Sequence, residues 1–246
     1  MQNNKETILR NYHRVLERIG EAAKSVRRDS AGIKVVVVTK GQPPEVIRTL
    51  TDLGVKDIGE NRVEEAVPKI ITFTEHPGVQ WHMVGHVQSR KARQVCQHFN
   101  LLHSLDSIKL AHRLDRFAGE LKRVLPVLLQ FNVSGEETKS GWRPLHKNNW
   151  AELLPEVEVV LQLPNLDVRG LMTMAPYSPN PEDARPMFVR LRELRDYLVE
   201  QFPETSWDEL SMGMSGDFEV GVQEGATILR IGTAILGERN YQRIRK

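Results

Sequence analysis

The chain contains 246 residues, of which 40% are hydrophobic and 27% charged; this balance is typical of a folded globular protein that buries a core without a disulfide or metal, and it excludes an intrinsically disordered chain. The formal net charge is only +2 and the basic residues are scattered, so we expect no nucleic-acid partner. A lone cysteine, a polar amino terminus and the absence of an apolar run near the roughly 20 residues of a membrane span predict a cytoplasmic protein with no internal disulfide, secretory signal or membrane segment.

An amphipathic helix is predicted at the start of the chain, within residues 1–30. Apolar residues recur there at helical spacing among charged neighbours: Ile8, Tyr12, Val15, Leu16, Ile19, Ala22 and Ala23. Because this helix precedes the first strand, we expect it to pack outside the main fold.

From Lys34 onward, short apolar runs alternate with longer segments of helical periodicity, a pattern typical of repeated βα units and a parallel sheet. The predicted strands are 34–39, 57–59, 80–84, 101–104, 127–132, 167–172, 209–212 and 227–230. The predicted helices between them are 44–53, 62–70, 89–99, 107–121, 148–161, 181–201 and 216–224.

Eight βα steps in a chain of this length predict the α/β class and a single (β/α)8 TIM barrel. An open doubly wound sheet would more often show five or six strands and a G-x-G-x-x-G turn after the first strand, which is absent. The proline-rich segment 175–181 falls in the loop after the sixth strand rather than between domains. We therefore expect residues 1–246 to form one domain, with residues 238–246 as a carboxyl-terminal tail.

Functional residues of (β/α)8 barrels follow the carboxyl ends of the strands, and Lys40 is the first candidate by this rule. It comes shortly after four consecutive valines, Val35 to Val38. Partly apolar surroundings favour the neutral amine that Schiff-base chemistry requires. The alternative is a lysine that extends from the strand end into solvent.

The last two predicted strands are each followed by a turn suited to phosphate. Ser215 is expected at or beside the N-cap of one helix, and Gly232 and Thr233 open the next segment. The loops after strands seven and eight of such barrels often form a phosphate site. Either turn alone is equally consistent with an ordinary capped helix, but both together, opposite a strand-end lysine, favour an aldehyde cofactor that carries a phosphate.

Arg230 immediately precedes the second of these turns. If its side chain points inward, its permanent charge would face the ring of such a cofactor and keep the pyridine nitrogen unprotonated, which weakens the ring as an electron sink. The alternative is a salt bridge with an inward-facing acid such as Glu60.

Three other patterns do not support a function. His82 and His86 are four residues apart, but their segment is a predicted strand that ends in glycine rather than a helix, and it lacks the glutamate of H-E-x-x-H, so zinc is not expected. Residues 213–217 resemble the nucleophile elbow G-x-S-x-G, yet Asp217 replaces the final glycine and no histidine follows in the chain, which argues against a serine hydrolase. Cys96 lies within a predicted helix and is expected to be a buried structural thiol.

Six sequence blocks occur in order along the chain: Val38-Thr39-Lys40, residues 59–65, residues 81–88, residues 170–174, residues 210–215 and residues 230–237. From about Ile33 to Gly237 the chain thereby resembles the pyridoxal phosphate homeostasis protein family, which is similar to the barrel domain of alanine racemase. Two departures are Thr39, where serine commonly precedes the lysine, and Ser89-Arg90-Lys91, where asparagine and lysine commonly follow the glutamine. Threonine at position 39 keeps the hydroxyl group that serine would supply.

The resemblance implies pyridoxal 5'-phosphate (PLP) as the cofactor, held covalently as an internal aldimine on Lys40. It also implies phosphate contacts from Ser215 and from the Gly232-Thr233 turn, with Arg230 at the pyridine nitrogen. The remaining residues that it implies for the pocket are Asn61, His86 and Met174.

Members of the family are regarded as lacking an established catalytic activity and as buffering and delivering PLP. The resemblance therefore implies a monomeric carrier whose partners are PLP and apo forms of PLP-dependent enzymes. Racemases of this fold add a β domain that supplies a second acid/base tyrosine; we expect no such domain here, and Tyr241 in the tail is expected to be a surface residue. The alternatives are a PLP-dependent racemase or decarboxylase of amino acids, and an interaction protein whose cofactor is only structural.

Overall fold

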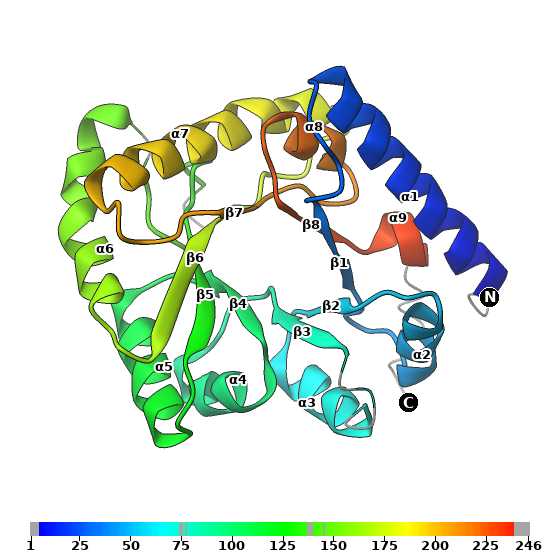
Figure 1. Cartoon of the computed structure of the whole chain (residues 1–246), viewed down its shortest axis with the longest axis horizontal. Helices are drawn as coiled ribbons and strands as arrows, with labels where there is room; N and C mark the ends of the chain where they lie inside the picture. Colours follow the sequence, from blue (N-terminus) through cyan, green and yellow to red (C-terminus); the bar gives the residue numbers. More distant parts are fainter. Residues whose placement is uncertain (1–4, 74–75, 77, 137–139, 145, 239–246) are drawn as a thin grey trace.

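The computed structural model describes residues 5–73, 76, 78–136, 140–144 and 146–238. Its centre is a closed barrel of eight parallel strands in the order β1 to β8, with β8 paired to β1 (Figure 1). The predicted α/β class and the TIM barrel are confirmed. No helix in this described part of the chain combines the length and the apolar character needed to cross a bilayer.

Every predicted strand is present, with bounds within two residues of the prediction. The strands are β1 Lys34–Val38, β2 Asp57–Glu60, β3 Gln80–Met83, β4 Leu101–Leu105, β5 Leu125–Gln130, β6 Leu166–Met172, β7 Glu209–Ser211 and β8 Ile228–Ile231. Short strands suffice because a closed barrel leaves no strand edge unpaired.

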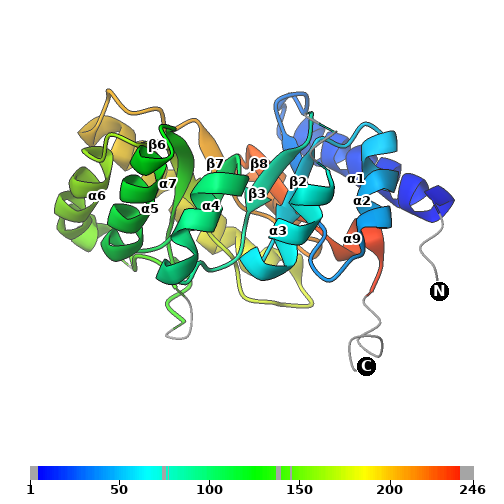
Figure 2. The same cartoon turned by 90° about the horizontal axis from the view of Figure 1, so that it is seen from below.

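The helices of the described residues surround this barrel (Figure 2). They are α1 Lys5–Ser25, α2 Pro44–Asp52, α3 Val63–Thr72, α4 Ala92–His98, α5 Ile108–Glu120, α6 Leu154–Leu161, α7 Arg185–Gln201, α8 Phe218–Gln223 and α9 Thr233–Leu236. Three predicted helices begin as tighter 3-10 turns, namely η1 Ser89–Lys91 before α4, η2 Lys147–Leu153 before α6 and η3 Pro181–Ala184 before α7. Such turns are common at the amino-terminal ends of α-helices.

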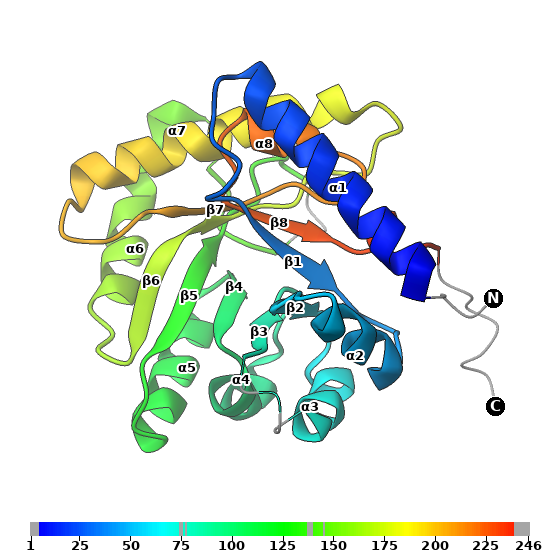
Figure 3. The ribbon, with the colours of Figure 1, turned by 45° about the vertical axis from the view of Figure 1, so that its right-hand side comes forward.

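Helix α1 lies outside the barrel, alongside α8 and α9, as Figure 3 shows. Its apolar stripe buries Ile8, Val15 and Ile19 among others, because these residues recur on one face of the helix. The predicted position of this amino-terminal helix is confirmed. Residues 1–4 and residues 239–246 of the predicted tail, with Tyr241, lie outside the described residues.

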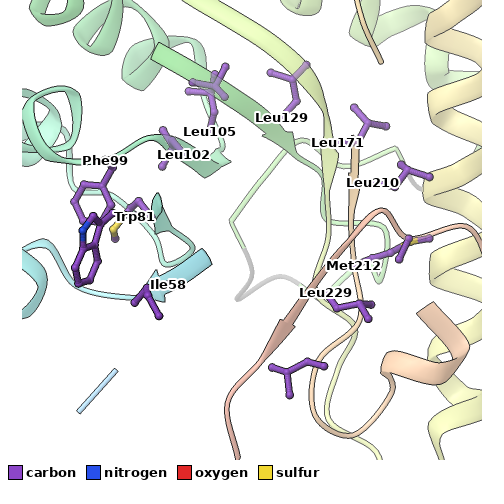
Figure 4. Packing of buried hydrophobic residues seen from close by; sticks show 14 of the residues in the cluster. Ile58, Trp81, Phe99, Leu102, Leu105, Leu129, Leu171, Leu210, Met212 and Leu229 are labelled. Atoms are coloured by element: carbon purple, nitrogen blue, oxygen red, sulfur yellow. The ribbon is translucent and has the colours of Figure 1, made fainter. Parts of the chain in front are cut away.

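The apolar core divides into two parts because side chains alternate across each strand. A large cluster lies between the strands and the helices, and Figure 4 shows some of its members, including Ile58, Trp81 and Phe99. A smaller cluster of buried residues fills the inside of the barrel: Val36, Val38, Val84, Leu101, Leu128, Met172 and Ile228. The valine run of β1 thus contributes to both parts, as expected for a strand of a parallel sheet that is covered on both faces.

Cys96 on α4 is fully buried, as predicted, and its thiol donates a hydrogen bond to the carbonyl of Leu114 at 3.3 Å. Burial raises the pKa of the Cys96 thiol to about 11. The thiol is therefore protonated at neutral pH, which suits a structural residue rather than a nucleophile.

Candidate functional site

A cavity of about 400 Å³ lies at the carboxyl end of the barrel strands. Its walls come from β8 and from the loops that follow β1, β2, β3, β6, β7 and β8. All of the residues predicted to bind the cofactor line it: Lys40, Asn61, His86, Met174, Ser215, Arg230, Gly232 and Thr233. The volume falls within the roughly 300–1,000 Å³ of small-molecule sites. The fold therefore brings the whole predicted set to one place.

A second depression, more open and about 590 Å³ in volume, lies over η3 and α7. One of its lining cations, Arg185, is already bonded to Glu182 and Glu224 at 2.6 Å each. No strand end contributes to its lining. None of the residues predicted to bind a cofactor lines this depression, so the barrel cavity is the candidate site.

Lys40 reaches the cavity because it continues the inward-facing alternation of β1. Val36 and Val38 belong to the apolar cluster inside the barrel, and Lys40 lies two residues beyond Val38, half-buried in the cavity wall. Its amine is thereby placed in the wall of the cavity, where a neutral lysine amine would be a nucleophile toward an aldehyde. Lys40 is therefore only partly exposed, in the wall of the cavity rather than on the outer surface.

The peptide that precedes Lys40 is held by a buried polar cluster of Thr39, Glu60 and Lys69. The Thr39 hydroxyl donates to Glu60 Oε1 at 2.7 Å, and Lys69 Nζ on α3 lies 2.7 Å from the same oxygen. Lys69 also donates to the Thr39 carbonyl at 3.0 Å. The hydroxyl group, which threonine and serine have in common, thus makes a hydrogen bond to Glu60. The cluster fixes the end of β1, just before Lys40.

Backbone donors converge on one oxygen at the turn after β8. The amides of Gly232 and Ala234 both donate to Ser215 Oγ, each at 3.2 Å. We call Ser215, Gly232, Thr233 and Ala234 the anion turn, because paired N–H groups at the start of a helix suit an anionic oxygen. The serine hydroxyl stands in for such an oxygen here, which demonstrates that the turn has donors aimed at a single acceptor.

The position of Ser215 differs from the prediction. Helix α8 begins at Phe218, and the residue before the helix is Asp217, so Ser215 lies in the preceding turn rather than at the N-cap. Asp217 accepts a hydrogen bond from the Met214 amide at 2.5 Å. That bond closes the turn tightly and moves the start of the helix, while Gly232 does precede α9 as predicted.

Arg230 points into the barrel, where it is 4% exposed. Its guanidinium donates to Ser211 Oγ at 2.5 Å and to the Thr173 carbonyl at 2.7 Å. Burial lowers the pKa of Arg230 to about 10, partly opposed by the Asp217 carboxylate, so the side chain stays charged at neutral pH. The predicted alternative, a salt bridge to Glu60, is wrong because Glu60 is bonded to Lys69.

Two further predicted residues, Asn61 and His86, line the cavity from the loops that follow β2 and β3. His86 is exposed, and its Nδ1 lies 2.7 Å from Asp106 Oδ2, which orients the ring. Asn61 is pressed against Gly85: a Cβ on Gly85 would lie 2.2 Å from the Asn61 carbonyl oxygen. Only glycine permits this approach, so the glycine that follows β3 has a steric cause.

Sequence reasoning missed several residues that support the predicted set. Asp106 holds His86, while Ser211 and Thr173 hold Arg230. Asp217 closes the turn of Ser215, and Tyr177, almost fully exposed, lies at the cavity wall in the loop after β6. The only available signal was their position just after strand ends, which Asp106 and Thr173 share with Lys40.

Comparison with known proteins gives a consistent result. Residues 15–240 match the model of the alanine racemase N-terminal domain family. The pyridoxal phosphate homeostasis protein of Aquifex aeolicus is 45% identical over 93% of this chain and 96% of its own length. The protein of that name from Pseudomonas aeruginosa is 41% identical over 96% of this chain and 97% of its own.

Solved structures agree. PipY of Synechococcus elongatus with PLP bound is similar with a TM-score of 0.77 and 38% identity, covering 89% of this chain and all of that chain. An alanine racemase of Clostridium difficile superposes with a TM-score of 0.71 at 15% identity, over 98% of this chain but 59% of its own. This second likeness shows a shared fold.

Proposed function

Because this chain belongs to the family of pyridoxal phosphate homeostasis proteins, we propose that it is a PLP carrier, which holds the cofactor on Lys40 and buffers or delivers it. The observation that carries the proposal is the position of Lys40 and the anion turn in the wall of one cavity. The relative PipY, with PLP bound in its structure, supports it.

When bound, PLP supplies an aldehyde that a lysine amine can capture and a phosphate that needs hydrogen-bond donors. The side chains of the cavity fit both groups. Lys40 Nζ would take the aldehyde carbon, and the amides of Gly232 and Ala234, with Ser215 and Thr233, would take the phosphate. We assign Arg230 to the pyridine nitrogen and Asn61, His86 and Met174 to the surrounding walls.

A carrier is favoured over an amino-acid racemase or decarboxylase by the charge beside the ring. Arg230 is a permanent donor with a pKa of about 10, so it cannot leave a proton on the pyridine nitrogen, and the ring remains a weak electron sink. Exposed His86 and Tyr177 border the cavity, so water has access to it. Both features disfavour sustained chemistry at the α-carbon of an amino acid.

The carrier and the enzyme differ in a measurable reaction. We expect the PLP-loaded protein, incubated with single L-amino acids in heavy water, to give no sustained exchange of the α-proton by NMR, while it does pass PLP to an apo-transaminase. Sustained exchange that is lost in Lys40→Ala would instead establish the enzyme. A protein whose cofactor is only structural would lose stability without PLP and would transfer none.

The Ser215→Ala variant tests the anion turn. We expect the dissociation constant for PLP to rise about tenfold, because one hydroxyl contact to a charged oxygen is lost, while the covalent bond to Lys40 still forms. Fluorescence titration measures the change. Ser206→Ala, in the loop before β7 and remote from the cavity, is the control. Equal affinities of the two variants would remove Ser215 from the phosphate site.

We further propose that residues 1–246 act as one PLP-binding domain, as a monomer in the cytoplasm, with apo PLP-dependent enzymes as recipients and no nucleic-acid or membrane partner. The near-neutral charge and the buried, protonated Cys96 are consistent with this setting.

A further inference from the structure

A continuous series of hydrogen-bonded side chains crosses the inside of the barrel. We call it the interior network, and its members are Asp57, His82, His103, Ser211 and Arg230. The distances are 2.9 Å from Asp57 Oδ1 to His82 Nε2, 2.9 Å from His82 Nδ1 to His103 Nε2, and 2.8 Å from His103 Nδ1 to Ser211 Oγ, which accepts from Arg230 at 2.5 Å. Of these five residues, only Arg230 belongs to the set predicted to bind the cofactor.

The interior network runs from one mouth of the barrel to the other. Asp57 is the first residue of β2, and its side chain is 24% exposed. Arg230 is near the carboxyl end of β8 and lines the cavity. The members between them are at most 3% exposed, so water does not substitute for any of their bonds.

Hydrogen-bond chemistry gives the interior network a direction. A guanidinium only donates, so Ser211 Oγ accepts from Arg230 and has one hydrogen to give. His103 Nδ1 is the other partner of that hydroxyl among the described residues, so it must accept, which places the His103 proton on Nε2.

The same reasoning continues to Asp57. Because His103 Nε2 donates, His82 Nδ1 accepts, and the His82 proton lies on Nε2, where it is donated to the Asp57 carboxylate. The opposite direction would require a doubly protonated His82 and would leave the buried Ser211 hydroxyl without an acceptor, which is costly. Burial lowers the pKa of His103 well below its ordinary value, and the positive charges of Arg230 and Lys34 act in the same direction, in agreement with a neutral ring.

We propose that the interior network allows Asp57, at the amino-terminal mouth of the barrel, to hold Arg230 in the orientation that the PLP ring requires. A ring nitrogen that donates to a carboxylate makes the other nitrogen of the same ring a better acceptor, and this polarisation passes along the network. The Asp57 carboxylate therefore strengthens the hydrogen bond that Ser211 Oγ accepts from the Arg230 guanidinium. His82, His103 and Ser211 are positioning residues in this account. The inference rests on the proposed function, since it assigns support for the ring site.

The first test needs no cofactor. In the wild-type protein labelled with 15N-histidine, long-range NMR correlations are expected to show His82 and His103 as neutral rings with the proton on Nε2. A proton on Nδ1 of either ring, or on both nitrogens of His82, would overturn the direction of the network and with it the proposal.

The second test changes only the exposed end. Asp57→Ala is expected to raise the dissociation constant for PLP roughly three- to tenfold and to shift the absorption of the bound cofactor. Asp57→Asn keeps an acceptor oxygen without the charge and should fall between Asp57→Ala and the wild type. Asp167→Ala is the matched control, because Asp167 also lies at the start of a strand, is 34% exposed and pairs with Arg169, outside the network.

The outcomes separate this inference from the proposed function. If the wild type captures PLP on Lys40 but Asp57→Ala keeps wild-type affinity and absorption, or if Asp167→Ala loses as much, the positioning role is wrong and the carrier stands. If the wild type captures no PLP on Lys40, the proposed function fails and the positioning role fails with it. A loss of stability in Asp57→Ala without a change in affinity or absorption also counts against the proposal.

Discussion

Replacement of Lys40 by alanine is expected to abolish covalent capture of PLP. The wild-type protein, incubated with PLP, reduced with borohydride and digested, should yield one modified peptide, and that peptide should contain Lys40. The variant should yield none, because Lys40 is the only lysine among the described residues that line the cavity. Its residual affinity, supplied by the anion turn and Arg230, should be lower by roughly tenfold to a hundredfold.

Lys34→Ala is the matched control for this experiment. Lys34 begins β1 and Lys40 follows its end, so both lysines belong to the same inward-facing alternation, but Lys34 lies at the other mouth of the barrel, 3.6 Å from Glu209. We expect it to retain the modified Lys40 peptide in full. Modification that persists in Lys40→Ala at another lysine, or that disappears in Lys34→Ala, would remove the basis of the proposed function.

Lys69→Met is expected to lower the free energy of unfolding by about 3–5 kcal/mol, the usual cost of leaving one member of a buried ion pair alone. The Glu60 side chain is completely buried, and Lys69 is its ion-pair partner at 2.7 Å. The second carboxylate oxygen of Glu60 already has no hydrogen-bond partner within the described part of the chain. Removal of the ammonium would leave an uncompensated buried charge directly below the end of β1, so PLP affinity should fall as well. Denaturant titration measures the stability.

Two further variants show whether the stability lost in Lys69→Met comes from the unpaired charge of Glu60. Lys91→Met breaks a lysine–glutamate pair of similar length, 3.1 Å to Glu64, on the surface, and should cost no more than about 1 kcal/mol. The double variant Glu60→Met/Lys69→Met removes both charges and should regain most of the stability lost in Lys69→Met. If Lys69→Met costs no more than Lys91→Met, the Thr39–Glu60–Lys69 cluster does not hold the end of β1.

The barrel could be predicted because its signals are local. Each strand is a short β-branched or apolar run followed by a helical repeat, and the count of these units fixes the closure. The site residues could be predicted for a related reason: parallel strands bring their carboxyl ends to one mouth, so Lys40, Ser215 and Gly232 meet there although they are far apart in sequence.

The supporting contacts could not be predicted because each joins separate elements. Lys69 is a helix residue whose partner is on β2, and nothing in the sequence of α3 distinguishes it from a solvent-exposed lysine. His82 and His103 likewise meet only inside the closed barrel, so the sequence gives no sign that the two rings are hydrogen-bonded. The start of α8 was misplaced because Asp217, and not Ser215, closes the preceding turn.

A crystal structure of the protein grown with PLP is the most direct measurement. We predict electron density continuous from Lys40 Nζ to the cofactor, with the phosphate oxygens on the amides of Gly232 and Ala234 and the ring nitrogen beside Arg230. Cofactor bound elsewhere, or bound here with its phosphate away from that turn, would contradict the account.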